Sequence, residues 1–273
     1  MRLALKVDVS SRRGAKEGVP RLMEMLARHR ARATFFLALG PDRMFQRPWL
    51  PGGDIGRRCA ALFRGVRDAG FEVAIQAYDP VRWRQTIGAA DAAWTQTQME
   101  CACEAFLRIF DAPAHAHGSS DWRMNRHAYR LTQRLQFRYA SDTRGTCPYI
   151  PVRNAEIIAC PQLPTTLPML EELMARDGIA AEDAVTRLLE ATARPVEPPC
   201  HVYTLRADRE GIRFAARFED LLAGWRAQGY ALTALEDCMR DINIARLPRH
   251  NVVDATIAGR RHPVALQGPE FLA

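Results

Sequence analysis

The sequence contains no long hydrophobic run. Its longest apolar stretch, residues 33–39, is interrupted by Thr34. This is far short of the roughly 20 residues that a membrane-spanning helix requires. The N-terminal segment reaches the charged residue Asp8 too early to contain the apolar core of a secretory signal peptide. We therefore expect a cytoplasmic protein.

Lysine is almost absent from the chain. It occurs only at Lys6 and Lys16, so 36 of the 38 basic residues are arginines, and the net charge is +7. Arginine favours bidentate contacts with phosphate and carboxylate groups. The basic segments are short and are not interleaved with aromatic residues, which argues against a nucleic-acid partner.

The cysteines form no recognisable framework. There are seven of them, an odd number, and they are scattered along the chain. This distribution predicts reduced thiols rather than disulfides. Cys101 and Cys103 lie one residue apart in a helical pattern, a spacing that does not match a zinc site.

Apolar strands alternate with amphipathic helices along nearly the whole chain, which is typical of an α/β fold with parallel strands. About seven strand–helix units, with no repeat or linker, predict a single domain over residues 1–273 that closes as an irregular (β/α)7-type barrel. In such barrels the functional residues lie at the C-terminal ends of the strands. We expect strands at residues 3–9, 33–39, 72–76, 114–117, 137–141, 200–205 and 230–235, and an extended loop at 157–168.

Several segments resemble, in the same order, the polysaccharide deacetylases of the NodB-homology superfamily. The likeness is greatest to the branch called ArnD, which removes a formyl group from 4-deoxy-4-formamido-arabinose linked to undecaprenyl phosphate. The segments are KVDVSSRRGAKEGVPRLMEML (6–26), FEVAIQAYDPVRW (71–83), WRMN (122–125), RYASDTRG (138–145), PTTLPMLEELMARDG (164–178), HVYTLRADREG (201–211) and IAGR (257–260).

The resemblance implies a NodB-type, TIM-like barrel and metal-assisted amide hydrolysis. In that chemistry one aspartate acts as the base on a water molecule. A second aspartate and an H-x-x-x-H pair hold a divalent metal, and a late histidine acts as the acid. In this chain Asp8 matches the base. Ser10, Gln76 and Pro80 stand at the metal positions, and Arg206 stands at the position of the acid.

These replacements predict that the chain holds no catalytic metal and no other cofactor. Serine and glutamine are weak neutral ligands, and proline offers no side-chain donor atom. Arg206 stays charged and cannot act as an acid at any working pH. One alternative metal site stays open, formed by His115 and His117 on one face of a strand with Asp121 or Asp8 as a third ligand.

Other residues at motif positions are expected to line the mouth of the barrel. If the chain is active, the candidate catalytic residues are Asp8 and Arg123, because the resemblance implies that Arg123 orients the base. Structural roles are the alternative, with salt bridges between Arg144 and Asp142 and between Arg123 and Asp8. The candidate ligand-binding residues are Asp79, Trp122, Asp142, Arg144 and Arg206.

The leading hypothesis is a divergent family member of envelope glycolipid or carbohydrate metabolism that lacks metal-dependent hydrolysis, a pseudoenzyme. It would bind an anionic sugar, a lipid-linked sugar phosphate, or an active paralogue. One alternative is a deacetylase or deformylase that hydrolyses the amide of a lipid-linked amino sugar with a rearranged site. Another is a metal-free enzyme that uses Asp8 as a general base beside Arg123.

The segment 41–58 stands where the lipid-linked branch carries a longer apolar insertion. It retains some apolar side chains beside several arginines. We expect at most a weak, peripheral contact with the inner face of the membrane. The apolar residues are Met44, Phe45, Trp49 and Leu50.

Overall fold

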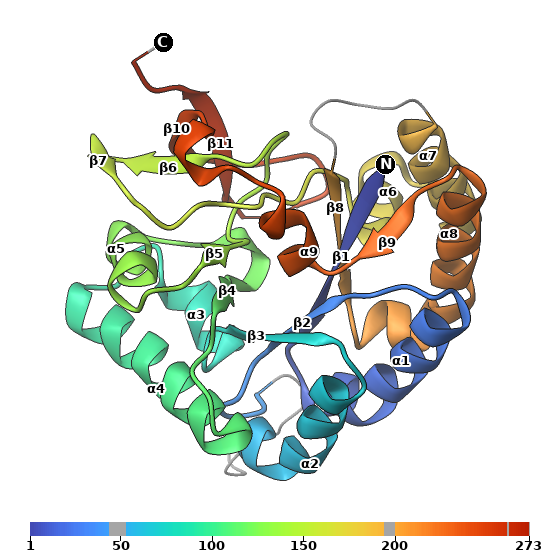
Figure 1. The fold of residues 1–273 in the computed structure, drawn as a ribbon, viewed down its shortest axis with the longest axis horizontal. Helices are drawn as coiled ribbons and strands as arrows, with labels where there is room; N and C mark the ends of the chain where they lie inside the picture. Colours follow the sequence, from blue (N-terminus) through green and yellow to red (C-terminus); the bar gives the residue numbers. More distant parts are fainter. Residues whose placement is uncertain (44–52, 194–199, 261, 273) are drawn as a thin grey trace.

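The structure, a computed structural model, describes residues 1–43, 53–193, 200–260 and 262–272 (Figure 1). Its central feature is a curled sheet of seven parallel strands in the order β5-β4-β3-β2-β1-β8, with β9 beside the first half of β1. The α/β class and the barrel-like fold predicted from the sequence are thereby confirmed. The strands are β1 (Arg2–Val9), β2 (Thr34–Leu37), β3 (Glu72–Gln76), β4 (Ala116–Gly118), β5 (Tyr139–Ala140), β8 (Cys200–Arg206) and β9 (Ala231–Thr233).

Helices cover the outer face of this sheet, and α9 covers one end of its interior (Figure 1). Helix α3 has no counterpart in the sequence expectations. It forms because Asp79 accepts a hydrogen bond from the backbone N–H of Arg82, and Pro80 stands at the first helical position. The helices are α1 (Val19–Arg28), α2 (Ile55–Asp68), α3 (Pro80–Thr86), α4 (Ala92–Phe110), α5 (Arg126–Arg134), α6 (Leu170–Asp177), α7 (Ala181–Thr192), α8 (Ala215–Ala227) and α9 (Leu235–Arg240).

The proline-rich segment after residue 157 was expected to be an extended loop. It lies between β5 and β8 in space and forms backbone hydrogen bonds with both strands. The backbone N–H of Leu163 donates to the carbonyl oxygen of Ala140 at 2.8 Å, and that of Thr166 donates to Val202 at 3.0 Å. The segment therefore spans the gap between the two edge strands with backbone hydrogen bonds on both sides.

Strand β1 shows how the interior is layered. Leu3, Leu5, Val7 and Val9 pack against the helices. Ala4, Lys6 and Asp8 alternate with them and face the interior. Near the N-terminal ends of the strands the interior is apolar, and toward the C-terminal ends it becomes polar. The apolar end contains Ala4, Phe36, Ala74, Ala116, Tyr139, Leu163, Val202, Leu235 and Cys238.

A second, four-stranded sheet lies beside the β5 edge of the barrel (Figure 1). It was not predicted, because its strands are short or lack a regular alternation of buried and exposed residues. They are β6 (Ile150–Arg153), β7 (Glu156–Ile157), β10 (Arg249–Ala255) and β11 (Val264–Glu270). The sheet joins the barrel through Arg144, whose backbone N–H donates to Ala265 at 2.9 Å. The link between β10 and β11 reaches the C-terminal ends of the barrel strands.

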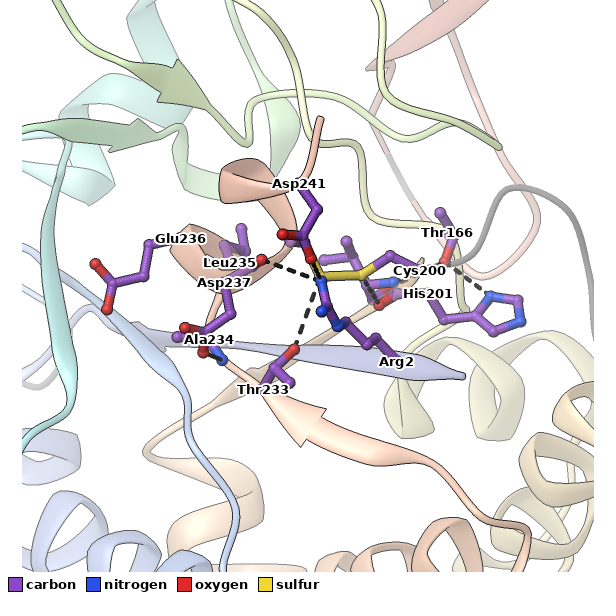
Figure 2. Close-up of a disulfide and its surroundings, with 12 residues drawn as sticks. Arg2, Thr166, Cys200, His201, Thr233, Ala234, Leu235, Glu236, Asp237 and Asp241 are labelled. Carbon is purple, nitrogen blue, oxygen red and sulfur yellow. Dashed lines mark hydrogen bonds and ion pairs between the residues drawn. A yellow bond between two sulfur atoms is a disulfide. The ribbon is translucent and has the colours of Figure 1, made fainter. Parts of the chain in front are cut away.

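The prediction that the cysteines are reduced is wrong for one pair. Cys200 at the start of β8 and Cys238 on α9 form a disulfide (Figure 2). Sequence spacing missed it because 38 residues separate the two cysteines, and only the closing of the barrel brings α9 against β8. Arg2 forms an ion pair with Asp241 beside the disulfide. Among the described residues, the other five cysteines are free.

No helix in the described part of the chain is both long enough and apolar enough to cross a membrane. The expectation of a weak membrane contact rests on Met44, Phe45, Trp49 and Leu50, which lie outside the described residues.

Candidate functional site

A cavity of about 1010 Å³ opens at the C-terminal ends of the barrel strands. We call it the mouth cavity. Its walls come from α3, from the turns after β4 and β8, from α6, and from the link between β10 and β11. Five arginines and three carboxylates face it. The charged lining residues are Arg84, Arg123, Arg206, Arg209, Arg260, Asp121, Glu171 and Glu172.

Two carboxylates organise the arginines on one side of the mouth cavity. Asp121 accepts hydrogen bonds of 3.0 Å from both Arg84 and Arg260. Glu172 accepts one of 2.7 Å from Arg260 and two from Arg144, at 2.8 and 2.9 Å. Burial acts to raise the pKa of Asp121, but the charges of Arg260, Arg84 and Arg206 outweigh it and hold the pKa below its ordinary value. Asp121 is therefore a fixed anion in the wall of the cavity.

The backbone beside this network adopts an unusual conformation. Asp121 and Trp122 have φ angles of 55° and 53°, in the left-handed region that non-glycine residues avoid. The indole of Trp122 contacts two guanidinium groups, with its ring centre 4.8 Å from Arg144 and 4.7 Å from Arg260. The indole N–H donates to Thr165 at 3.0 Å. Trp122 is thus a buried side chain whose ring packs against Arg144 and Arg260.

Arg206 ends strand β8 and is held loosely. Its guanidinium lies 3.4 Å from Glu171 and 3.4 Å from Asp208, both at the long end of ion-pair distances. Burial acts to lower the pKa of Arg206, but the charges of Asp208, Glu171 and Asp121 outweigh it and raise the pKa above its ordinary value. Arg206 therefore brings a permanent positive charge to the cavity.

Asp8 lies near the C-terminal end of β1 and is not among the residues that line the mouth cavity. Its side chain is 9% exposed, and Oδ1 is buried without a hydrogen-bond partner among the described residues. Burial raises the pKa of Asp8 to about 6, opposed chiefly by the charge of Lys6. A carboxylate with this pKa can accept a proton near neutral pH.

The residues at the metal positions do not offer a metal site. The Ser10 hydroxyl donates to the side-chain carbonyl oxygen of Gln76 at 2.7 Å, so these two side chains are bonded to each other. Pro80 begins α3 and carries no donor atom. In residues 1–43, 53–193, 200–260 and 262–272, no three His, Cys, Asp or Glu side chains converge in a metal-binding group. This donor set does not fit a divalent cation.

The alternative metal site on β4 is wrong. His115 precedes the strand and is exposed. His117 is buried on the outer side of the sheet, where its ring stacks on Phe137 with ring centroids 5.8 Å apart. Its Nδ1 lies 2.8 Å from Asp142. The His117–Asp142 pair is therefore part of the core between the sheet and the helices.

Of the residues proposed from the sequence to bind ligand, Arg206 lines the mouth cavity. Asp79 caps α3 and pairs with Arg43 at 2.5 Å. Asp142 is fully buried beside His117, and Arg144 lines a smaller cavity of about 380 Å³ rather than the mouth cavity.

The two salt bridges offered as structural alternatives do not form. Asp142 pairs with His117 and Arg144 with Glu172. Arg123, the candidate orienting residue, lines the mouth cavity but donates to the backbone oxygen of Arg84.

The sequence did not predict most of the arginines that line the mouth cavity. Arg260 belongs to the matching segment IAGR, and Arg209 and Glu171 belong to other matching segments, but none of them was given a role. A count of charged residues within those segments would have pointed to them. Arg84 lies one residue beyond the matching segment 71–83, and only the unpredicted helix α3 places it at the cavity.

Searched against models of known protein families, the chain matches none. Among curated proteins, it is 28% identical over 252 residues to the "Probable 4-deoxy-4-formamido-L-arabinose-phosphoundecaprenol deformylase ArnD" of Shewanella sediminis. The match covers 81% of this chain and 80% of the relative.

Solved structures share the fold. A "putative polysaccharide deacetylase" from Mycobacterium smegmatis superposes with a TM-score of 0.72 and 17% identity, covering 94% of each chain. A "CE4 family pseudoenzyme" from Bacillus anthracis superposes with a TM-score of 0.56 and 12% identity, covering 87% of this chain and 65% of the other. Both likenesses agree with the superfamily that the sequence segments indicate.

Proposed function

We propose that this chain, a member of the polysaccharide deacetylase superfamily, binds an anionic sugar-phosphate-like ligand at the mouth of its barrel without the superfamily's catalytic metal. The observation that carries the proposal is the lining of the mouth cavity, where five arginines face three carboxylates. Guanidinium groups match the geometry of phosphate and carboxylate oxygens. The excess of positive charge attracts an anion into the cavity.

Two of these arginines are able to form hydrogen bonds to an anion, which supports the proposal. Arg123 forms no ion pair with a carboxylate in the described part of the chain, and both contacts of Arg206 are long. An anion in the cavity can replace these weak contacts with short, charge-assisted hydrogen bonds. Each such bond contributes about 1.5–3 kcal/mol where it is sheltered from water.

The sugar part of the proposal follows from the relatives. The Shewanella protein is named for a deformylase that acts on an arabinose derivative carried by phosphoundecaprenol. Such a substrate combines a sugar with a phosphate, which suits a polar cavity rich in arginine. We therefore place the ligand among sugar phosphates, free or linked to a lipid.

The proposal is tested by calorimetry and thermal unfolding with three probes: inorganic phosphate, glucosamine 1-phosphate and N-acetylglucosamine 1-phosphate. At least one sugar phosphate should bind more tightly than phosphate and raise the melting temperature with concentration. Arg206→Gln should weaken that affinity about tenfold or more. Arg226→Gln, an exposed arginine on α8, is the matched control and should bind like the wild type.

Two results would overturn the proposal. One is that none of the three probes binds. The other is that Arg226→Gln weakens binding as much as Arg206→Gln, which would mean that only the general positive charge of the protein is sensed. If no sugar phosphate binds, an active paralogue as a protein partner becomes the better hypothesis.

A second candidate function is hydrolysis of the amide of a lipid-linked amino sugar by a rearranged site. The observation that favours it is Asp8, a buried carboxylate near the end of β1 with a pKa of about 6 and an oxygen without a partner among the described residues. Asp8 would act as a general base on water. Release of formate or acetate from an N-acylated sugar phosphate by the wild type, but not by Asp8→Asn, would establish this function instead.

A further inference from the structure

A second cavity of about 460 Å³ adjoins the mouth cavity. The two cavities share Arg123 and Pro263 in their linings, so they are adjacent. The walls of the second cavity come from residues 87–90 after α3, from residues 123–127 at the start of α5, and from the second sheet. Nothing in the proposed function uses this second cavity.

Arg123 lies at the boundary between the two cavities. Its Nη1 donates to the backbone oxygen of Arg84, which lines the mouth cavity. Its Nη2 lies near Gly88, which lines the second cavity and where a Cβ atom would be 3.4 Å from this nitrogen. A guanidinium group has five N–H donors, and the backbone of Arg84 is their only acceptor among the described residues. Arg123 therefore has donors left for a ligand that reaches both cavities.

The lining of the second cavity carries more positive than negative charge. It contains Arg123, Arg126 and Arg153, and one carboxylate, Asp254. Asp254 accepts a hydrogen bond from Arg153, so its charge is already paired. In the part of the chain that the structure describes, the side chain of Arg126 contacts only the ring of its neighbour His127, at 3.4 Å, and forms no ion pair. The remaining positive charge attracts an anion.

Asn125 fixes the wall of the second cavity. Its side-chain N–H groups donate to the backbone oxygens of Ile87 at 3.1 Å and Ala90 at 3.2 Å. Its side-chain oxygen accepts from the backbone N–H of Ala128 at 2.8 Å. These bonds fasten the loop after α3 to the helix that carries Arg126. A cavity whose walls are already in place loses less conformational entropy when a ligand binds.

We propose that the second cavity is a second anion subsite, and that the ligand is a sugar carrying two phosphate groups. One phosphate lies among the arginines of the mouth cavity, the other lies beside Arg126 in the second cavity, and Arg123 contacts the ligand between them. Guanidinium groups in both cavities suit phosphate oxygens. The place of the first phosphate rests on the proposed function, and the second subsite adds the number and spacing of the anionic groups.

The second subsite is tested by calorimetry with three probes that share one sugar: glucose 1-phosphate, glucose 6-phosphate and glucose 1,6-bisphosphate. The bisphosphate should bind at least about tenfold more tightly than either monophosphate. Additional charge alone can cause such a preference, so the variants are decisive. Arg126→Gln should reduce the preference at least about threefold and leave the affinity for the monophosphates nearly unchanged. Arg206→Gln should weaken the binding of all three probes.

Arg134→Gln is the matched control. It removes the same charge from the other end of α5, where the side chain is exposed and lines neither cavity. This variant should keep the wild-type preference for the bisphosphate. Arg126 is exposed as well, so both variants should fold, and melting temperatures equal to that of the wild type verify this.

The inference is overturned if Arg126→Gln keeps the wild-type preference for the bisphosphate, or if Arg134→Gln reduces it equally. The mouth site then stands alone, provided that Arg206→Gln still weakens the binding of the monophosphates. Failure of the proposed function gives a different result, in which Arg206→Gln leaves the binding of every probe unchanged. If none of the probes binds to the wild type, both ideas are wrong.

Discussion

The hydroxyl of Ser10 donates a 2.7 Å hydrogen bond to the side-chain oxygen of Gln76. These residues follow β1 and end β3, so their side chains meet across the end of the intervening strand β2. The resemblance places both at metal positions. Their direct contact means that the backbone still brings the two positions together, although the side chains are neutral. These two positions therefore form a frame on which metal-binding side chains can be placed.

Restoring the donor atoms should restore metal affinity. The triple variant Ser10→Asp, Gln76→His, Pro80→His places one carboxylate and two imidazoles on this frame, the ligand types that zinc prefers. Titration calorimetry should show saturable zinc binding in the variant and none in the wild type. Chelators should leave the melting temperature of the wild type unchanged and lower that of the zinc-loaded variant.

The control for this experiment is Ser10→Ala with Gln76→Leu, which breaks the hydrogen bond without adding ligands and should bind no zinc. Zinc binding by the wild type would contradict the prediction. A triple variant that folds but binds no zinc would show that position 80, at the start of α3, lies too far from the other two.

The local patterns of the sequence were enough to predict the barrel. Strand β3 has the predicted limits, and β1 differs from them by one residue. The segments that match the superfamily gave the correct order and fold. The second sheet escaped prediction because β7 has two residues and most of β10 is half-buried or exposed, so neither carries a hydrophobic period. The disulfide escaped because it depends on tertiary closure.

The sequence predicted residues of the candidate site only where a matching motif lies at the end of a strand. Arg206 ends β8 and lines the mouth cavity, whereas Asp8, near the end of β1, is buried and does not line it. The partners of the arginines could not be read from the sequence, because they are long-range pairs. Arg144, for example, meets Glu172 from a segment 28 residues away, rather than the nearby Asp142.

Glu210 should make stability depend on pH. It is buried, and burial raises its pKa to about 8, above the ordinary value of 4.5. Because the folded pKa is raised, its contribution to stability is fully present below about 4.5 and is lost as the pH rises through 8. Glu210→Gln removes this loss. The variant should therefore match the wild type near pH 5 and exceed its free energy of unfolding by at least about 1 kcal/mol at pH 8.5.

Urea unfolding at both pH values measures this difference. Glu190→Gln, an exposed change on α7, is the control and should follow the wild type across the range. An advantage of Glu210→Gln that is the same at pH 5 and at pH 8.5 would contradict the assigned titration. It would point instead to a change in packing around the backbone N–H of Arg206, which donates to Glu210 at 2.8 Å.

Reduction of the Cys200–Cys238 disulfide should destabilise the fold. The bond closes a loop between residues 38 positions apart and ties α9 to β8. A constraint of this kind contributes about 2–4 kcal/mol, so dithiothreitol should lower the melting temperature. Cys200→Ala should show the lower value without reductant and no further response to it. Cys103→Ala, which removes a free cysteine, should remain sensitive to reductant. A wild type that ignores dithiothreitol would contradict the prediction.

The contact between the turns after β1 and β8 depends on Gly18. A Cβ atom at this position would lie 1.9 Å from the backbone oxygen of Ala207, the residue after Arg206. The nearest atoms are all backbone, so no flexible side chain can move aside. A Cβ atom at Gly211 would in turn lie 2.7 Å from the Cα of Gly18. Gly18→Ala should therefore cost about 3 kcal/mol of stability. It should also weaken ligand binding, because the turn that follows Arg206 must shift.

The matched control is Gly65→Ala, on the exposed face of α2, where a Cβ atom meets nothing within 4 Å. In the interior of a helix alanine is favoured over glycine by roughly 0.5–1 kcal/mol, so this change should stabilise the protein. Urea unfolding of both variants at pH 7 gives the comparison. If Gly18→Ala proves as stable as the wild type, the two turns are not in the close contact described, and the position of Arg206 at the mouth would need another support.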